Sequence, residues 1–126
     1  MTLIAGLDVG TTGVKAIAIT PEGEVVARAE RAYPLSTPRP GWSEQDPEDW
    51  WRASEAALAE LGGDIVGIGL SGQMHGLVAL DEEDRVVRPA ILWNDQRTGA
   101  ECAEIEERIG LARLIDELAP DRNKDI

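Results

Sequence analysis

Two apolar runs joined by a polar, glycine-containing turn open the chain and predict a β-hairpin. The runs cover residues 4–9 and 14–19, and the turn between them covers residues 10–13. A second turn at residues 20–23 precedes residues 25–30, whose alternating pattern indicates a third antiparallel strand. The chain is therefore expected to begin as a β-meander.

A proline-rich connection and a helix are predicted next. Residues 33–41 contain three prolines and are expected to cross the surface, because proline cannot continue a helix. Asp46 has the position of a helix cap, Pro47 follows at the first helical position, and Gly62-Gly63 ends the apolar pattern. The helix is expected to turn three apolar side chains toward the sheet: Trp51, Leu58 and Leu61.

The segment after this helix predicts the centre of the fold. Residues 64–70 carry glycines but are otherwise apolar, which favours a buried strand paired parallel to the first strand through the helical crossover. The glycines are expected to let the helix or a ligand approach the strand closely. Short extended pieces are expected around an acidic turn at residues 81–84; they are residues 77–80, 85–87 and 89–93.

The carboxyl-terminal part predicts two helices. The first spans residues 98–109, with Cys102, Ile105 and Ile109 on one face, and Gly110 breaks it. A short helix over residues 111–118 and a polar tail over residues 119–126 are expected to follow.

This order of elements predicts an α/β protein with an α+β-like mixed sheet. It is the ribonuclease-H-like arrangement found in each half of actin- and hexokinase-type ATPases, although many α+β folds would fit almost as well. Residues 1–118 are expected to form a single domain, since 126 residues suffice for one core but not for two.

Composition and charge narrow the function classes. The net charge of −12 argues against nucleic-acid or anionic-membrane partners. One cysteine and one histidine exclude an internal disulfide and a zinc cluster. No apolar run approaches membrane-spanning length and no signal peptide is evident, so a cytoplasmic location is expected. Phenylalanine is absent, which leaves four tryptophans as the large anchors for a core or a pocket.

The first turn is a candidate site for phosphate. Gly10 and the glycine at position 13 allow a backbone that aims successive N–H groups at one point, and Thr11, Thr12 and Lys15 add two hydroxyls and a cation. Asp8 would suit a Mg²⁺ ion that bridges to the phosphates. An ordinary tight turn without a ligand accounts for these residue types equally well.

Two later stretches are candidate sites for a small polyol. Met74 and His75 lie between two glycines, where the sulfur could contact carbon atoms and the imidazole could bond a hydroxyl group. Residues 93–97 place a tryptophan beside an amide, a carboxylate and a guanidinium. A structural histidine and a capped helix start with one buried tryptophan are the alternatives.

Three other patterns do not support a function. Residues 67–72 fit the G-x-G-x-x-G spacing of dinucleotide-binding folds, but that motif needs a helix directly after it, and a strand-like run follows here. No P-loop motif occurs. Ser71, His75 and Asp95 could be drawn as a catalytic triad, but a chain this acidic offers many such combinations.

Three stretches together resemble one family, the FGGY carbohydrate kinases, and within it the xylulokinases. The first stretch is residues 8–15, with the sequence Asp-Val-Gly-Thr-Thr-Gly-Val-Lys. The second is residues 41–51, which contain Gly-Trp-Ser-Glu-Gln-Asp-Pro and the Trp-Trp pair. The third combines residues 72–76 with residues 91–97. The likeness covers roughly residues 2–110 without gaps.

The resemblance implies an actin/hexokinase-type fold and phosphorylation of D-xylulose, or a similar ketose, with ATP and Mg²⁺. It assigns the phosphate and metal end of the site to Asp8, Gly10, Thr11, Thr12 and Lys15, with Asp8 toward the metal. It assigns the sugar end to Gln73, Met74, His75, Trp93, Asn94, Asp95 and Arg97.

The resemblance also implies that important parts lie outside this chain. The family's members are two-domain kinases several times this length, and their general-base Asp and adenosine-binding domain lie beyond the matched region. Since phosphoryl transfer depends on positioning both reactants in a closed site, the isolated chain is expected to be inactive or nearly so. The alternative is a non-catalytic fragment that binds sugar or phosphate, or that associates with itself through an exposed apolar face.

Overall fold

A computed structural model describes residues 1–118 of the chain. The chain divides into two compact units, residues 1–95 and the segment that begins at Gln96, and each is described here by itself. The predicted polar tail at residues 119–126 lies outside the described residues. That residues 1–118 form one domain stays a prediction.

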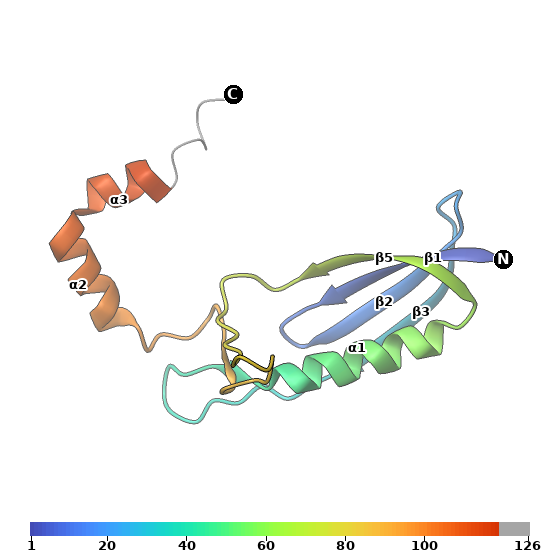
Figure 1. The fold of residues 1–126 in the computed structure, drawn as a ribbon, viewed down its shortest axis with the longest axis horizontal. Coiled ribbons are helices and arrows are strands. Elements are labelled where there is room, and N and C mark those ends of the chain that lie inside the picture. Colours follow the sequence, from blue (N-terminus) through green and yellow to red (C-terminus); the bar gives the residue numbers. More distant parts are fainter. Residues whose placement is uncertain (119–126) are drawn as a thin grey trace. The chain divides into compact units, whose positions relative to one another are not determined.

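A four-stranded mixed sheet and one helix form the first unit (Figure 1). The sheet has the order β3-β2-β1-β5. Its strands are β1 (Thr2–Val9), β2 (Gly13–Ile19), β3 (Val25–Ala32) and β5 (Asp64–Gly72), and the helix is α1 (Pro47–Leu61). The predicted meander is confirmed, because β1 and β2 pair antiparallel, as do β2 and β3. The predicted parallel pairing of β5 with β1 is confirmed as well.

Helix α1 begins and ends where the sequence predicts. The Asp46 carboxylate accepts a hydrogen bond of 2.9 Å from the N–H of Glu48, Pro47 opens the helix, and Gly62 follows its last residue. The helix packs on β1, β2 and β3. The contact surface consists mainly of small side chains, which allow the helix to approach the sheet closely; its buried members include Ala5, Val14, Ala16, Ala18, Ala29, Ala53 and Ala57.

The expected orientation of the tryptophans in α1 is wrong in one respect. Trp51 is 66% exposed, whereas Trp50, which was not expected to face the core, packs against it. Leu58 and Leu61 face the core as predicted. Trp50 turns inward because its indole N–H has a buried acceptor, the side chain of Gln45, which apolar periodicity cannot reveal.

The expectation that β5 is a buried strand is wrong. Ile68 and Leu70 lie beside Ala5 and Leu7 of β1, but they are 50% and 75% exposed. The reason is that β5 is an edge strand and α1 packs on the other three strands. A Cβ atom on Gly67 would meet no atom within 4 Å, so this glycine does not serve the expected close approach of the helix.

A two-stranded sheet that the sequence did not predict joins two distant segments of the first unit. It pairs β4 (Glu44–Gln45) antiparallel with β6 (Ala90–Ile91). The expected strand at residues 77–80 is not formed; single bridges join Leu77 to Ile91 and Leu80 to Val86. The acidic turn between them is confirmed. Its Asp81 carboxylate accepts hydrogen bonds from backbone N–H groups, which satisfies the turn locally.

The second unit contains two helices, as predicted. They are α2 (Gly99–Ile109) and α3 (Leu111–Leu118), and Gly110 separates them with a φ of 93°, a conformation that favours glycine. Ion pairs between residues four apart support each helix, Arg108 with Glu104 and Arg113 with Glu117. In the described part of the chain, neither these helices nor α1 is long and apolar enough to cross a bilayer.

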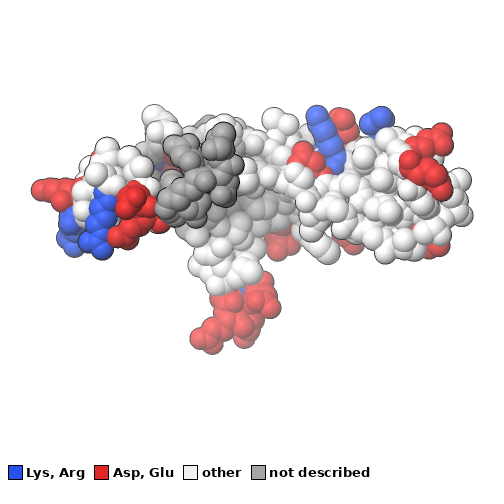
Figure 2. All heavy atoms as spheres, turned by 90° about the horizontal axis from the view of Figure 1, so that it is seen from above, with Lys and Arg blue, Asp and Glu red and all other residues white. Residues whose placement is uncertain are grey.

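Acidic groups dominate the charged surface. Figure 2 shows one face of the molecule, on which the acidic side chains gather in several groups and the basic ones are fewer. This distribution agrees with the net charge of −12. The lack of nucleic-acid and membrane partners stays a prediction.

Candidate functional site

The turn between β1 and β2, residues 10–13 and here named the glycine turn, has its carbonyl groups bonded into the protein. The Tyr33 hydroxyl donates to the Gly10 carbonyl, and the Gln45 amide donates to the Thr11 carbonyl at 2.6 Å. The Thr12 carbonyl accepts the N–H of Tyr33 at 3.4 Å, and the Gly13 carbonyl accepts the N–H of Gly10 at 3.0 Å. The turn is therefore anchored by its acceptors.

The same geometry leaves donors of the turn available. Among the described residues, the backbone N–H groups of Thr11 and Thr12 have no hydrogen-bond acceptor, and the Thr12 side chain is exposed. The Thr11 hydroxyl differs, because it accepts from the Trp93 indole at 3.1 Å and donates to Gln73 at 3.3 Å. The turn can thus offer two backbone donors and one hydroxyl to an anion.

Asp8 and Lys15 flank a hollow on the face of the sheet opposite α1. They are directly paired across β1 and β2, and both are exposed. The hollow measures about 370 Å³ and includes Ser71 in its lining. Its floor is low because Gly6 and Gly69 carry no side chains there. The lining of the hollow therefore includes a carboxylate, from Asp8, and an ammonium group, from Lys15, on the strands that lead into and out of the glycine turn.

The Tyr33 phenol holds the glycine turn through a hydrogen bond that requires its protonated form. Its side chain is buried, and its hydroxyl donates to the Gly10 carbonyl. Burial, together with the neighbouring Asp8 carboxylate, raises the pKa of Tyr33 to about 12. The phenol is therefore protonated at neutral pH and remains a donor.

The loop after β5, residues 72–76 and here named the His75 loop, continues directly from the sheet. The N–H of Gln73 donates to the Val9 carbonyl at 2.9 Å, which keeps the loop beside the end of β1. His75 has a φ of 61°, an uncommon conformation for a non-glycine residue and one that is often found at functional sites. The loop contributes Gln73, His75 and the adjacent glycines to a cavity of about 270 Å³ that Trp50 and Leu92 also line. Met74 is 70% exposed.

Gln45, a residue without a predicted role, connects the two loops. Its side chain is 2% exposed. Its Nε2 donates to the Thr11 carbonyl, and its Oε1 accepts from Trp50 Nε1 and from Gln73 Nε2, each at 3.0 Å. One hydrogen-bond network therefore contains residues of the predicted phosphate end and of the predicted sugar end.

The predicted residues 93–97 fall into different environments. Trp93 is 57% exposed and reaches the glycine turn through its indole N–H. One oxygen of Asp95 accepts the N–H of Ser43 at 2.7 Å, so this carboxylate holds the preceding segment in place. Asn94 is exposed beside that segment. Arg97 belongs to the second unit, and its position relative to the first is not described.

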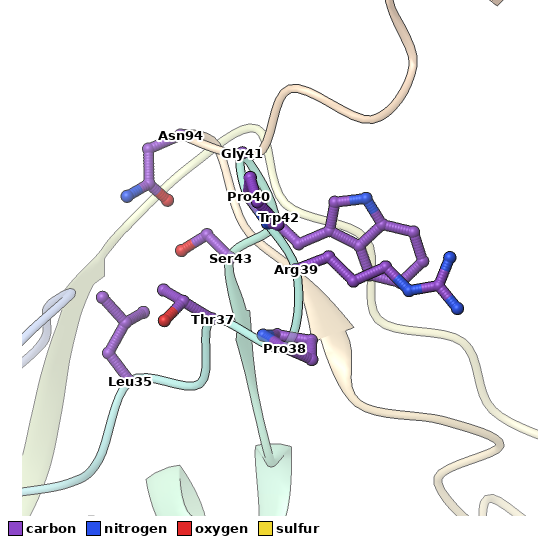
Figure 3. A pocket seen from close by; sticks show the side chains of 9 residues that line it. All are labelled: Leu35, Thr37, Pro38, Arg39, Pro40, Gly41, Trp42, Ser43 and Asn94. Carbon is purple, nitrogen blue, oxygen red and sulfur yellow. The ribbon is translucent and has the colours of Figure 1, made fainter.

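Figure 3 shows a second cavity, of about 480 Å³, which the sequence did not predict. Its lining comes from residues 35–43 and Asn94. The Arg39 guanidinium lies 4.9 Å from the centre of the Trp42 ring, on the side of the loop away from Ser43 in this view. The hydroxyl of Ser43 is buried and lacks a hydrogen-bond partner among the described residues.

Comparison with known proteins decides the family. The model for the amino-terminal domain of the FGGY family of carbohydrate kinases matches residues 3–118. The chain belongs to this family. Xylulose kinase from Escherichia coli (strain K12) is 48% identical over 115 residues, which are 87% of this chain and 24% of that protein.

Solved structures agree with this assignment. The FGGY chain superimposes on xylulose kinase from Rhodospirillum rubrum with a TM-score of 0.86 at 38% identity, over 90% of this chain and 25% of the other. Gluconate kinase from Lactobacillus acidophilus gives a TM-score of 0.83 at 28% identity, over 90% and 24% of the two chains. The predicted α/β class and actin/hexokinase-type fold are confirmed. The chain spans about a quarter of the length of these relatives.

The carboxylates of the described residues are the candidate ligands for a metal ion. No cluster of three or more His, Cys, Asp or Glu side chains occurs among residues 1–118. Asp8 nevertheless fits Mg²⁺, because this ion usually keeps several water ligands and takes only one or two carboxylates together with substrate phosphates. The exposed Asp8 carboxylate could supply the protein ligand, and the N–H groups of Thr11 and Thr12 could bind the phosphate oxygens.

Proposed function

We propose that this chain is the sugar- and phosphate-binding part of an ATP-dependent kinase that converts D-xylulose to D-xylulose 5-phosphate. The terminal hydroxyl oxygen of the sugar attacks the γ-phosphorus of ATP, and the bond from that phosphorus to the bridging oxygen of ADP breaks. The hydroxyl proton passes to a general-base Asp, which the resemblance locates outside this chain.

One observation carries the proposal: the glycine turn and the His75 loop belong to a single hydrogen-bond network, and the N–H groups of Thr11 and Thr12 in that turn have no acceptor among the described residues. Phosphate oxygens would accept from Thr11 N–H and Thr12 N–H, and Lys15 would add a positive charge. Asp8 would hold Mg²⁺, which neutralises charge on the phosphates when bound. A sugar seated at the His75 loop would then lie next to the phosphate site.

The sugar end has the residue types that a ketose needs. The His75 imidazole and the Gln73 amide can bond hydroxyl groups, while Met74 and Trp93 offer exposed apolar surface to carbon atoms. Asn94 and Asp95 of the first unit would be outer contacts of the sugar. D-xylulose is the proposed substrate because the relatives from Escherichia coli and Rhodospirillum rubrum are named xylulose kinases.

A titration of the chain with D-xylulose tests the sugar end. We expect ¹H–¹⁵N amide signals of residues 72–76 and 93–97 to shift and to saturate. A double variant, Met74→Ala/His75→Ala, should lose this response, and D-gluconate should produce a weaker one. A spectrum that ignores D-xylulose would refute sugar binding by this chain.

A second titration tests the phosphate end, and an assay tests turnover. Mg²⁺ with ATP should shift the Thr11 and Thr12 amide signals more than ATP alone, because Asp8 repels an anion that lacks a bridging cation. We expect ADP release by the isolated chain to remain at the level of the Met74→Ala/His75→Ala variant. Sugar-dependent ADP release above that level would show that the chain is active on its own.

Self-association is a second candidate function. The edge strand β5 exposes Val66, Ile68 and Leu70, and an exposed apolar edge can pair with another chain. Sedimentation velocity should then reveal a dimer whose population rises with concentration and falls in Leu70→Lys. A monomer at every concentration would exclude it.

A further inference from the structure

We propose that Gln45 is a positioning residue that holds the glycine turn and the His75 loop at a fixed spacing and transmits ligand binding from one to the other. The inference deepens the proposed function, and its ligand measurement rests on that function. Its hydrogen-bond measurement does not.

The orientation of the Gln45 amide is determined by its partners. The Thr11 carbonyl can only accept a hydrogen bond, so the group that faces it at 2.6 Å must be Nε2. The Trp50 indole can only donate, so the group that faces it at 3.0 Å must be Oε1. A flipped amide would lose both bonds. Gln45 therefore has one orientation in this site.

The orientation of Gln45 determines that of Gln73. Because Gln45 Oε1 is an acceptor, the atom of Gln73 that approaches it at 3.0 Å must be Nε2, which also lies 3.4 Å from the Gly10 carbonyl. Gln73 Oε1 then faces the Thr11 hydroxyl at 3.3 Å as an acceptor. The Thr11 hydroxyl in turn accepts the Trp93 indole N–H. Each hydrogen bond of this network, from the Trp93 indole to the Thr11 carbonyl, therefore has one donor and one acceptor.

Burial makes the arrangement sensitive to a single change. Gln45 is 2% exposed, and the Thr11 carbonyl, the Trp50 indole and the Gln73 amide all depend on it. Removing the Gln45 amide leaves the partly buried Thr11 carbonyl and Trp50 indole N–H without this partner, which costs more than the hydrogen bonds themselves contribute. The most direct relief is a movement of the glycine turn away from the His75 loop.

Secondary structure gives Gln45 little freedom to adjust. Its backbone belongs to β4, which pairs with β6, and Asp46 next to it caps α1. The side chain therefore projects from a rigid position into the space between the two loops. This is the property expected of a residue that sets the spacing of others.

The test compares Gln45→Met with Glu55→Met, a change to methionine at an exposed position of α1. Methionine has nearly the length of glutamine but makes no comparable hydrogen bonds, so the volume of the buried site is kept. In Gln45→Met we expect shifts in the Trp50 and Trp93 indole signals and in the amides of residues 10–13 and 72–76. Glu55→Met should leave all of them unchanged. Shifts confined to Trp50 would overturn the proposal.

Ligand binding supplies the second measurement. D-xylulose should shift the Thr11 and Thr12 amides of the wild-type chain, and this remote response should disappear in Gln45→Met while its dissociation constant rises about tenfold. A dissociation constant within about twofold of wild type would contradict the proposal. If the wild-type chain does not bind D-xylulose, the proposed function fails, and the signal shifts in the absence of ligand decide the role of Gln45.

Gln45→Glu keeps the proposal testable if Gln45→Met does not fold. The carboxylate retains an acceptor for Trp50 and Gln73, but when ionised it cannot donate to the Thr11 carbonyl. Burial raises the pKa of such a carboxyl, so it should gain a proton, and with it a donor, as the pH falls. Signals of residues 10–13 should then return toward wild-type positions with decreasing pH. A merely space-filling role predicts no such recovery.

Discussion

Gly13 provides the sharpest test of how the glycine turn is joined to the sheet. A Cβ atom added there would lie 2.4 Å from the carbonyl oxygen of Arg31 and 3.0 Å from Cα of Ala32. The first distance is about 1 Å short of ordinary van der Waals contact, which begins near 3.4 Å. Both obstacles are backbone atoms of the β2–β3 pair, so no side chain can rotate to make room.

The cost of Gly13→Ala follows from this geometry. The end of β3 must move about 1 Å away from β2, which resembles overpacking of a core and costs about 1–3 kcal/mol. One weakened ladder bond adds about 1 kcal/mol. The gain from replacing a flexible glycine in a strand offsets about 0.5–1 kcal/mol. We therefore expect Gly13→Ala to destabilise the chain by about 1–3.5 kcal/mol, with a central value of about 2 kcal/mol.

Thermal unfolding followed by circular dichroism measures the effect. A loss of about 2 kcal/mol should lower the melting temperature by roughly 8–16 °C, since about 1 kcal/mol corresponds to about 4–8 °C in a small domain. Gly67→Ala is the matched control, because its added Cβ meets no atom within 4 Å, and it should melt close to wild type. A Gly13→Ala protein that melts within about 2 °C of wild type would refute the steric argument.

Three further predictions concern other parts of the chain. Tyr33 is the single tyrosine, so ultraviolet absorbance should show one phenol that ionises near pH 12. The free energy of unfolding that depends on this raised pKa should be fully present below pH 10 and be lost between pH 10 and pH 12. Ionisation of the phenol at pH 10 would contradict the prediction. Trp50→Ala should cost about 2 kcal/mol or more in urea unfolding, whereas Trp51→Ala should stay within about 0.5 kcal/mol; equal losses would contradict the assigned orientations. Hydrogen bonds from the Arg85 backbone and side chain lower the pKa of Asp81. Arg85→Ala removes the side-chain bond and should raise that pKa in a carboxyl NMR titration. An unchanged pKa would show that the backbone bonds alone cause the lowering.

The local pattern determined much of the fold. The apolar runs at residues 4–9 and 14–19, the turns that follow them and the alternation in residues 25–30 predicted the meander. Asp46 with Pro47 predicted the start of α1. Caps and turns can be predicted because they depend on a few neighbouring residues. The sequence motifs at residues 8–15 and 72–76 also indicated the family. Each of these inferences needed only contacts between residues close in the sequence, or a resemblance carried by short motifs.

Only the tertiary structure decided which side chains meet. The burial of β5 could not be read from its apolar residues, because burial depends on where α1 lies across the sheet. Gln45 gave no site signal of its own, since its partners Thr11 and Gln73 are 34 and 28 residues away. Hydrogen bonds over such separations arise from the packing of β4 beside the glycine turn and the His75 loop, and no sequence period encodes that placement. The sequence determined the elements and the chemistry available at each loop, and the tertiary structure decided that the buried Gln45 amide bonds to both loops.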